Sequence, residues 1–178
     1  MTGIEKDLAD IRRLTRIALP ESDSYLYRLG VAVYGFASVS SFMAEVICYM
    51  DPEQSRSDLE AKMGGPLAAT FKQAVGKIEN SQPQAFAAGE LAGKLFTTLN
   101  DERSDIIHAY PITSPTHVQI LHRRQYPAQT KKKGTPKGYE KPPKYFEVTN
   151  EFLDNFIARL AHVNDDLYRI RAILRPDI

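Results

Sequence analysis

This 178-residue sequence contains a single cysteine and has almost no net charge. The only cysteine, Cys48, cannot form an internal disulfide, and it lies in an apolar run where a buried free thiol is ordinary. These features favour a reducing compartment, and we expect the protein to be cytoplasmic. The 23 basic and 22 acidic side chains leave a formal charge of +1, so the whole molecule is not an obvious binder of polyanions.

Motifs for a bound nucleotide or metal are also missing. The sequence contains no glycine-rich phosphate loop and no closely spaced pair of cysteines. His117 and His122 could join His108 as metal ligands, but no cysteine or close carboxylate completes such a site. We therefore expect the protein to use no cofactor and no metal.

The sequence also has no secretory signal. The first 19 residues mix both charge signs with periodic apolar residues and contain no apolar core followed by a cleavage site. Residues 30–50 carry only one charge, Glu45, and are long enough to span a membrane. Their serines and regular apolar stripe instead favour the central helix of a bundle, so we expect no membrane partner, with a membrane-associated protein as the alternative. The stripe consists of Leu26, Leu29, Val33, Phe36, Ser40, Met43 and Ile47.

Length and hydrophobic content predict a single domain, residues 1–178, with one core. Apolar residues at helical spacing predict an all-α fold, a bundle of four or five helices. Ser57–Glu60 has the spacing of a capping box, and Gly64-Gly65-Pro66 is expected to break or kink the helix that begins there. The other expected helices span residues 1–20, Ser22 or Ser24 to about Met50, 67–79, 85 to about 108, and Thr149 or Asn150 to Pro176.

A long basic insertion, residues 122–147, precedes the last expected helix. Eight bases and two acids give it a charge of +6, which leaves −5 for the rest of the chain. Its proline, glycine and lysine content predicts an exposed, mobile loop, although weak alternation at its borders also allows a β-hairpin. Bases can neutralise phosphates and rings can stack on unpaired bases, so the insertion suits single-stranded RNA, with a merely solvated loop as the alternative. The candidate RNA-binding residues are Arg123, Arg124, Lys131, Lys132, Lys133, Tyr126 and Tyr139.

The stretch NDERSDIIHAYP, residues 100–111, places Arg103 and His108 near the end of a long predicted helix. Histidine is the side chain that moves a proton near neutral pH, and arginine offers a planar fork of donors matched to phosphate oxygens. Together they could cleave RNA without a metal, with the RNA 2′-hydroxyl as nucleophile and a 2′,3′-cyclic phosphate as product. Arg103 and His108 are therefore the candidate catalytic pair, although a sequence of this composition is expected to contain roughly one such spacing by chance, so the assignment depends on its context.

This stretch resembles the signature of the HEPN superfamily, in which an arginine, four to six intervening residues and a histidine lie on a core helix of a small α-helical bundle. The expected helix order extends the resemblance over most of the chain. It implies a metal-independent endoribonuclease, often a toxin or phage-defence effector, that works as a homodimer. An antitoxin protein is a further implied partner, and the superfamily also includes inactive members that only bind. Many members have Asn or Asp directly after the arginine, where this sequence has Ser104.

Helix geometry separates the two catalytic candidates, because residues five apart on an ideal helix differ by about 140° in direction. Either the helix loosens near Pro111, or a two-fold dimer sets His108 of one chain beside Arg103 of the other. We favour the dimer. Ser104, Asp105 and Tyr110 are expected to support the site by orienting the imidazole or touching RNA.

A purely structural role for the same residues is the competing interpretation. The negative end of the helix dipole stabilises a histidine in the last turn, and Arg103 could pair with a nearby acid on a solvated surface. A non-catalytic helical module of the same layout, which binds a phosphate or a protein acid without turnover, is the second functional hypothesis. The candidate partners of Arg103 are Glu90, Asp101 and Glu102.

Overall fold

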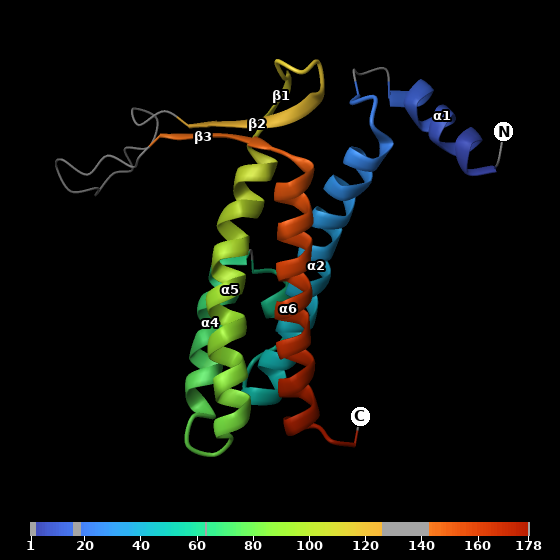
Figure 1. Cartoon of the computed structure of the whole chain (residues 1–178). Helices are drawn as coiled ribbons and strands as arrows, with labels where there is room; N and C mark the ends of the chain where they lie inside the picture. The colour runs from blue at the N-terminus through green and yellow to red at the C-terminus, as the bar shows by residue number, and fades with distance from the viewer. Residues whose placement is uncertain (1–2, 16–18, 63, 126–142, 178) are drawn as a thin grey trace.

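The structure, a computed structural model, describes residues 3–15, 19–62, 64–125 and 143–177. Within these ranges, six helices and three strands follow one another along the chain (Figure 1). The last helix begins directly after the last strand, so the sheet interrupts an otherwise helical chain. The elements are α1 (Gly3–Thr15), α2 (Asp23–Met50), α3 (Arg56–Glu60), α4 (Gly64–Lys77), α5 (Pro83–Ile107), β1 (Tyr110–Thr113), β2 (Gln119–Gln125), β3 (Lys144–Val148) and α6 (Asn150–Leu174).

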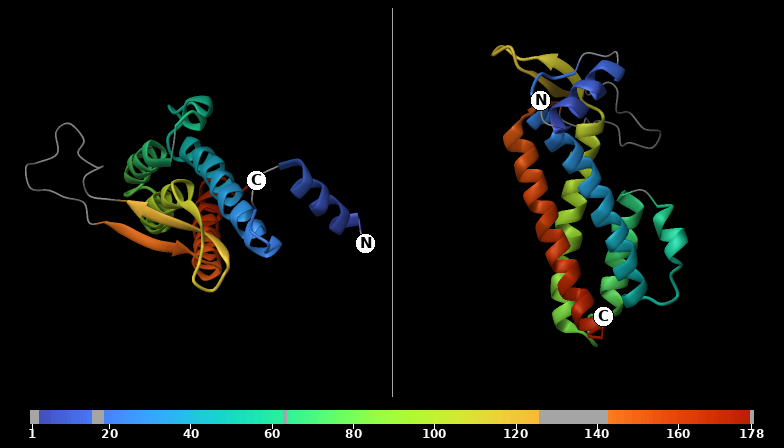
Figure 2. Two further views of the ribbon diagram at one scale, coloured as in Figure 1. Left: turned by 90° about the horizontal axis from the view of Figure 1, so that it is seen from above. Right: turned by 90° about the vertical axis from the view of Figure 1, so that its right-hand side faces the viewer.

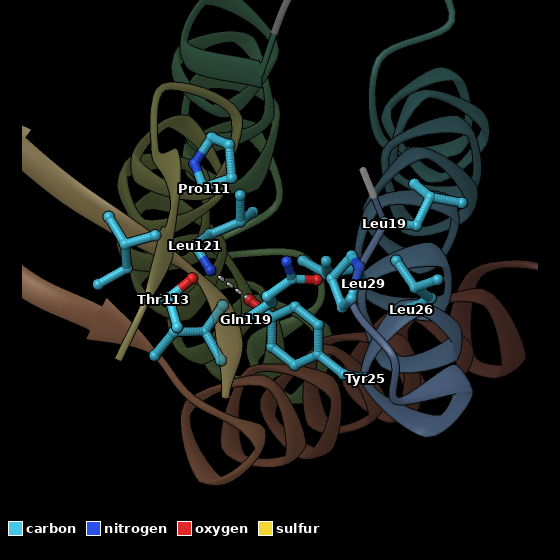
Figure 3. Close-up of a pocket in the computed structure, with 11 residues that line it drawn as sticks. Leu19, Tyr25, Leu26, Leu29, Pro111, Thr113, Gln119 and Leu121 are labelled. Carbon is cyan, nitrogen blue, oxygen red and sulfur yellow. Dashed lines mark hydrogen bonds between the residues drawn. The ribbon is translucent and has the colours of Figure 1, made fainter. Parts of the chain in front are cut away.

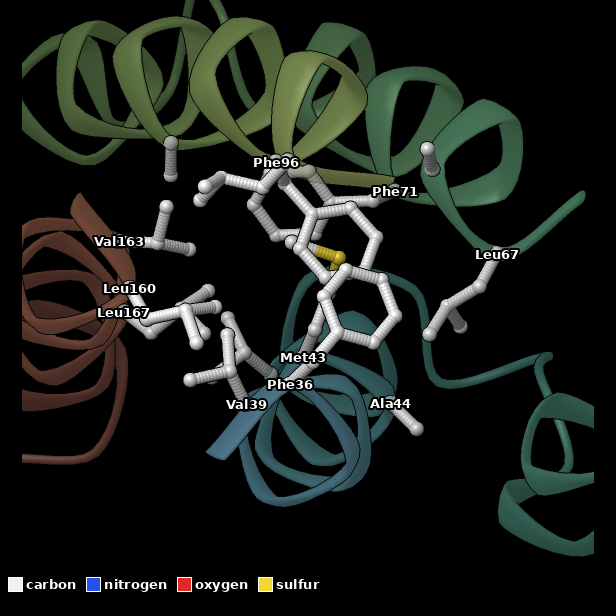
Figure 4. Packing of buried hydrophobic residues seen from close by; sticks show 14 of the residues in the cluster. Phe36, Val39, Met43, Ala44, Leu67, Phe71, Phe96, Leu160, Val163 and Leu167 are labelled. Carbon is white, nitrogen blue, oxygen red and sulfur yellow. The ribbon is translucent and has the colours of Figure 1, made fainter. Parts of the chain in front are cut away.

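The long helices α2, α4, α5 and α6 lie side by side as a bundle, and α1 projects away from its upper end (Figures 1 and 2). Their apolar faces meet in one core, in which the rings of Phe36 and Phe96 stack with centroids 5.0 Å apart (Figure 4). The predicted mostly helical fold is therefore confirmed, with six helices among the described residues where four or five were expected. Other buried members of this core include Met43, Ile47, Phe71, Leu99, Phe156, Leu160 and Leu167.

Helix α2 is the one helix in the described part of the chain that is long and apolar enough to cross a membrane. A core helix of a soluble protein has the same composition, and α2 buries Phe36, Met43 and Ile47 against the other helices. The interpretation of this segment as a central bundle helix agrees with that packing. The expected stripe is wrong at Val33, which is 40% exposed, because the buried face of α2 passes through Tyr25, Ala32 and Phe36 instead.

Two of the three predicted N-terminal caps form side-chain hydrogen bonds. Ser22 and Thr149 accept hydrogen bonds from the backbone N–H groups of Tyr25 and Phe152, as the predicted caps of α2 and α6. The predicted capping box at Ser57 is wrong, because α3 begins at Arg56 and Ser55 occupies its N-cap. Arg56 links the start of α3 to α2 through an ion pair with Glu45, and it also pairs with Glu60 within α3.

The expected all-α fold is wrong in one respect, since an antiparallel sheet in the order β1-β2-β3 covers the end of α5 (Figure 1). Pro111 is already part of β1, where it pairs with Leu121, so the chain passes directly from helix to strand. At both borders of residues 122–147 the hairpin alternative is confirmed, because β2 and β3 pair there as antiparallel strands, and the loop alternative is wrong for these residues. Residues 126–142, the middle of the predicted mobile loop, lie outside the described residues.

Candidate functional site

The predicted catalytic pair lies in the last turns of α5. Arg103 is half-buried, and its guanidinium carbon lies 5.6 Å from the centre of the Phe36 ring on α2. His108 is exposed and caps the C-terminus of α5 with φ −98° and ψ 12°. Within the described part of the chain, no hydrogen bond joins the two side chains. One copy of the chain therefore does not assemble them into a shared site.

Two of the three acids within two positions of Arg103 are bound to other bases, and the third, Asp101, is exposed. Glu102 receives two hydrogen bonds from Arg159 of α6, one of them 2.9 Å long from Nη1 to Oε1. Asp105 pairs with Arg123 and Lys144. Among the described residues, no carboxylate forms an ion pair with Arg103. The Arg103 guanidinium thus keeps its positive charge without a counter-ion and contacts an aromatic face instead.

Asp105 is a buried carboxylate with two cationic partners. Its side chain is 8% exposed, and its Oδ1 accepts a hydrogen bond of 3.0 Å from Arg123 Nε while its Oδ2 accepts one of 2.6 Å from Lys144 Nζ. These bases come from β2 and β3, so one residue of α5 holds both strands against the end of the helix. A buried charge needs such partners, because removal from water is costly. Asp105 was predicted to support the catalytic pair, and the structure places it as the anchor of the sheet.

Arg123 extends this anchor to the backbone of His108. Its Nη1 donates to the carbonyl oxygen of His108 at 3.4 Å, and its Nη2 donates to Gln125 Oε1 at 3.1 Å. With a side chain only 13% exposed, Arg123 is engaged inside the protein, although we predicted it as an RNA contact. Lys144 was missed among the candidates because its contact with Asp105 spans 39 positions and leaves no local pattern in the sequence.

The sheet has two faces with different contents. Directly opposed residues of an antiparallel pair share a face, and successive residues of a strand alternate between faces. We call the face that meets the bundle the inner face, and it carries Leu121, Arg123, Lys144, Phe146 and Val148. The opposite or outer face carries Tyr110, His122, Arg124, Tyr145 and Glu147.

The outer face is rich in exposed rings and contains an exposed base. Tyr110 is 66% exposed and Tyr145 is 54% exposed. The His122 ring meets the Tyr145 ring edge-on with centroids 5.6 Å apart, and Arg124 Nε donates to His122 Nδ1 at 3.3 Å. Toward the β1–β2 turn this face also contains Ile120, which is buried and lines a pocket between the start of α2 and the β1–β2 hairpin.

Tyr25 of α2 fastens the inner side of the sheet to the bundle. Its hydroxyl accepts from the N–H of Leu121 at 2.8 Å (Figure 3). It also donates to the carbonyl oxygen of Val148 at 2.9 Å. Burial raises the pKa of the Tyr25 phenol, and the hydrogen bond from Leu121 opposes that rise. Beside it lies an apolar pocket of about 350 Å³ between α2 and the β1–β2 hairpin, with Gln119 on its strand side.

The remaining predicted site residues are divided between the end of α5 and the segment that is not described. Ser104 is half-buried, and its carbonyl oxygen accepts the backbone N–H of His108 at 3.1 Å. In the described part of the chain, no group of three or more histidine, cysteine, aspartate and glutamate side chains is placed to hold a metal. Tyr126, Lys131, Lys132, Lys133 and Tyr139 lie outside the described residues.

Comparisons with protein-family models, with curated proteins and with solved structures find no match to this chain. A functional conclusion therefore depends on the residues and their geometry alone.

Proposed function

We propose that the protein is a metal-independent endoribonuclease of the HEPN type, with Arg103 and His108 as its catalytic residues. The observation that carries the proposal is the unpaired charge of Arg103. Glu102 and Asp105 flank it in sequence but are held by Arg159 and by the two bases of the sheet. A half-buried guanidinium without a carboxylate partner is suited to receive an anion, and a phosphate matches its fork of donors.

The proposed reaction needs one proton acceptor, one proton donor and a cation on the phosphate. Imidazole of His108 removes the proton from the RNA 2′-hydroxyl, and the 2′-oxygen attacks phosphorus. The bond from phosphorus to the 5′-oxygen breaks, and that oxygen leaves with a proton from a second imidazole. Arg103 stabilises the negative charge that builds up on the phosphoryl oxygens. The products are a 2′,3′-cyclic phosphate and a free 5′-hydroxyl.

A homodimer supplies the second imidazole and solves the geometric problem of the single chain. In a two-fold assembly, Arg103 of one protomer lies near His108 of the partner subunit, and the same arrangement recurs on the other side of the axis. His108 is exposed at the end of α5 and is therefore accessible to such a partner. The resulting cleft contains two arginines and two histidines around one scissile phosphate.

Cleavage of labelled RNA in excess EDTA tests the activity. The unmodified protein is expected to produce fragments with 2′,3′-cyclic phosphate ends, and to leave DNA of the same sequence intact. Arg103→Ala and His108→Ala are each expected to lower the cleavage rate by about 100-fold or more. Arg169→Ala, which removes an exposed base on α6, serves as the matched control. Undiminished cleavage in either catalytic variant contradicts the proposal.

Mixing the two inactive variants tests the dimer. A heterodimer of Arg103→Ala and His108→Ala contains one intact pair, formed by the histidine of the first chain and the arginine of the second. If the pair forms between chains, mixing restores part of the activity, because the one remaining imidazole can give the leaving 5′-oxygen the proton that it took from the 2′-hydroxyl. If it forms within one chain after a rearrangement near Pro111, the mixture stays as inactive as its components. Recovery of activity on mixing therefore separates the two geometries.

A non-catalytic binding module is the second candidate, and a specific observation favours it. Arg103 contacts Phe36 on one side of α5, whereas His108 is exposed at the helix end, so the chain presents two separate groups. Such a protein would bind a phosphate through Arg103 and release it unchanged. RNA that binds in an Arg103-dependent manner and stays intact identifies this case.

As a nuclease, the protein would act as a toxin or phage-defence effector, for which an antitoxin protein is the natural partner.

A further inference from the structure

The outer face of the sheet combines two exposed tyrosines with a base on rigid, paired strands. The register places Tyr110 opposite His122 and Arg124 opposite Tyr145, so the two tyrosines stand in adjacent rows on the two edge strands. Strand spacing and rise per residue put them about 12 Å apart across the sheet. Both side chains are more than half exposed, and the Tyr145 ring also meets the ring of His122 on the middle strand.

We propose that this outer face is a stacking platform for the bases of single-stranded RNA. Tyr110 and Tyr145 each receive one unpaired base, and Arg124 contacts the phosphate between them. Stacking on aromatic rings tolerates any base, and arginine adds charge, which is the combination found in proteins that bind single strands. The strands that carry the rings are already held in place, because Asp105 and Tyr25 attach the inner side of the sheet to the bundle.

Charge and position both favour nucleic acid as the occupant. Strands β2 and β3 lead into and out of residues 126–142, whose sequence contains five lysines and one glutamate. Glu147 is the acid on the outer face, and it is half-buried whereas Arg124 is exposed. Tyr110 follows His108 by two residues, so a strand of RNA on the platform reaches the end of α5. The platform thus deepens the proposed function and rests on it for the choice of RNA over DNA.

Binding is measured with a fluorescein-labelled 2′-O-methyl oligoribonucleotide, which lacks the 2′-hydroxyl that the proposed cleavage needs. Tyr110→Ala and Tyr145→Ala are each expected to weaken binding about fivefold or more, whereas Tyr110→Phe and Tyr145→Phe keep most of it. Arg124→Gln lowers the slope of log affinity against log salt by about 0.7, while the tyrosine variants leave the slope unchanged. Tyr34→Ala, at a 79% exposed tyrosine on α2, is the matched control and is expected to have no effect.

Stacking can also be observed directly, because the chain contains no tryptophan. Tyr145→Trp introduces a single indole on the platform, and its fluorescence is expected to fall when the oligonucleotide binds. Tyr34→Trp places the same reporter on α2 and is expected to show no change. Equal quenching in both variants, or none at position 145, overturns the platform.

The outcomes separate the platform from the nuclease. Tyrosine-dependent binding of the modified oligonucleotide without cleavage of ordinary RNA supports the platform and contradicts the proposed activity. If ordinary RNA is cleaved, and neither Tyr110→Ala nor Tyr145→Ala weakens binding of the modified oligonucleotide, the activity is supported and the platform is overturned. Failure of the unmodified protein to bind the oligonucleotide also overturns the platform, as does a loss in the phenylalanine variants equal to that in the alanine variants.

Discussion

The two faces of the sheet differ in their surroundings: the side chains of the inner face pack against the bundle, whereas several side chains of the outer face are exposed. On the inner face, Arg123 and Lys144 meet the buried carboxylate of Asp105, and Val148 joins the core. On the outer face, Tyr110 and Tyr145 remain more than half exposed. The comparison shows that position on a face, rather than membership of a basic segment, decides whether a base is available to a ligand.

Replacing Asp105, the carboxylate of α5 that pairs with Arg123 and Lys144 of the inner face, is expected to give the largest effect on stability. Asp105→Asn leaves the Arg123 guanidinium buried without a compensating charge, and loss of one member of a buried ion pair costs about 3 kcal/mol or more. Urea denaturation of the unmodified protein and the variant measures the difference. Asp154→Asn is the control, because Asp154 pairs with Arg28 at the surface and such pairs contribute at most about 1 kcal/mol. Equal losses in the two variants would remove the distinction between buried and surface pairs.

The second effect concerns the hydroxyl that joins α2 to the sheet. Tyr25→Phe leaves the N–H of Leu121 and the carbonyl of Val148 without their common partner, which is expected to cost about 2 kcal/mol. Thermal or urea unfolding at neutral pH measures it. Tyr27→Phe, at a 74% exposed position on the same helix, is expected to change nothing. A Tyr25→Phe variant as stable as the unmodified protein would show that the sheet does not depend on this contact.

The stabilisation that Tyr25 provides is also expected to depend on pH. Burial raises the pKa of Tyr25 in the folded chain, whereas the phenol of the unfolded chain ionises near its ordinary value of about 10. The stability that Tyr25 contributes is therefore complete below that pH and is lost as pH rises toward the raised value. The difference in unfolding free energy between the unmodified protein and Tyr25→Phe should shrink above about pH 10. A difference that stays constant there would contradict the buried phenol.

Lys144 lies on the inner face but is more exposed than Arg123, so its replacement is expected to give a smaller effect. Its side chain is 41% exposed, so Lys144→Met removes a partly solvated ion pair and keeps most of the apolar stem. We expect a loss below about 1 kcal/mol in urea denaturation, because Arg123 still neutralises Asp105. A loss as large as that of Asp105→Asn would mean that the lysine, and not the arginine, holds the sheet.

The smallest effect on stability is expected on the outer face itself. Arg124→Gln and Tyr145→Ala alter exposed side chains and should shift the unfolding free energy by no more than about 0.5 kcal/mol. Their effect should appear in the binding of single-stranded RNA instead. A strong destabilisation in either variant would assign the outer face a structural role and weaken its interpretation as a binding surface.

The helices were predictable because their signals are local. Ser22 and Thr149 cap α2 and α6, and α5 was expected from residue 85 to about 108, close to its observed span. The sheet was harder to predict, because β2 buries only Ile120 and its partner strand β3 begins 19 residues after β2 ends. Alternation is weak in a strand whose inner face contains an arginine held by a carboxylate from another element.

The candidate site was predictable to a different degree at each residue. The spacing of Arg103 and His108 could be read directly, and so could their separation by about 140° around the helix. The acid that Arg103 would pair with could not be predicted, because Arg159 lies 57 positions from Glu102 and reaches it only through the packing of α6 on α5. Asp105 was assigned to the catalytic pair for its proximity in sequence, whereas its contacts come from β2 and β3.

The sequence by itself determined the long helices, the caps of α2 and α6, and the presence of an arginine and a histidine at the end of α5, because each depends on residues within a few turns. Only the tertiary structure decided which charges are neutralised and which remain available. Asp105 and Glu102 could each have paired with several bases, and the packing of β2, β3 and α6 against α5 selected their partners. Burial makes that selection strong, since a carboxylate removed from water must be matched by the cations that the fold brings to it.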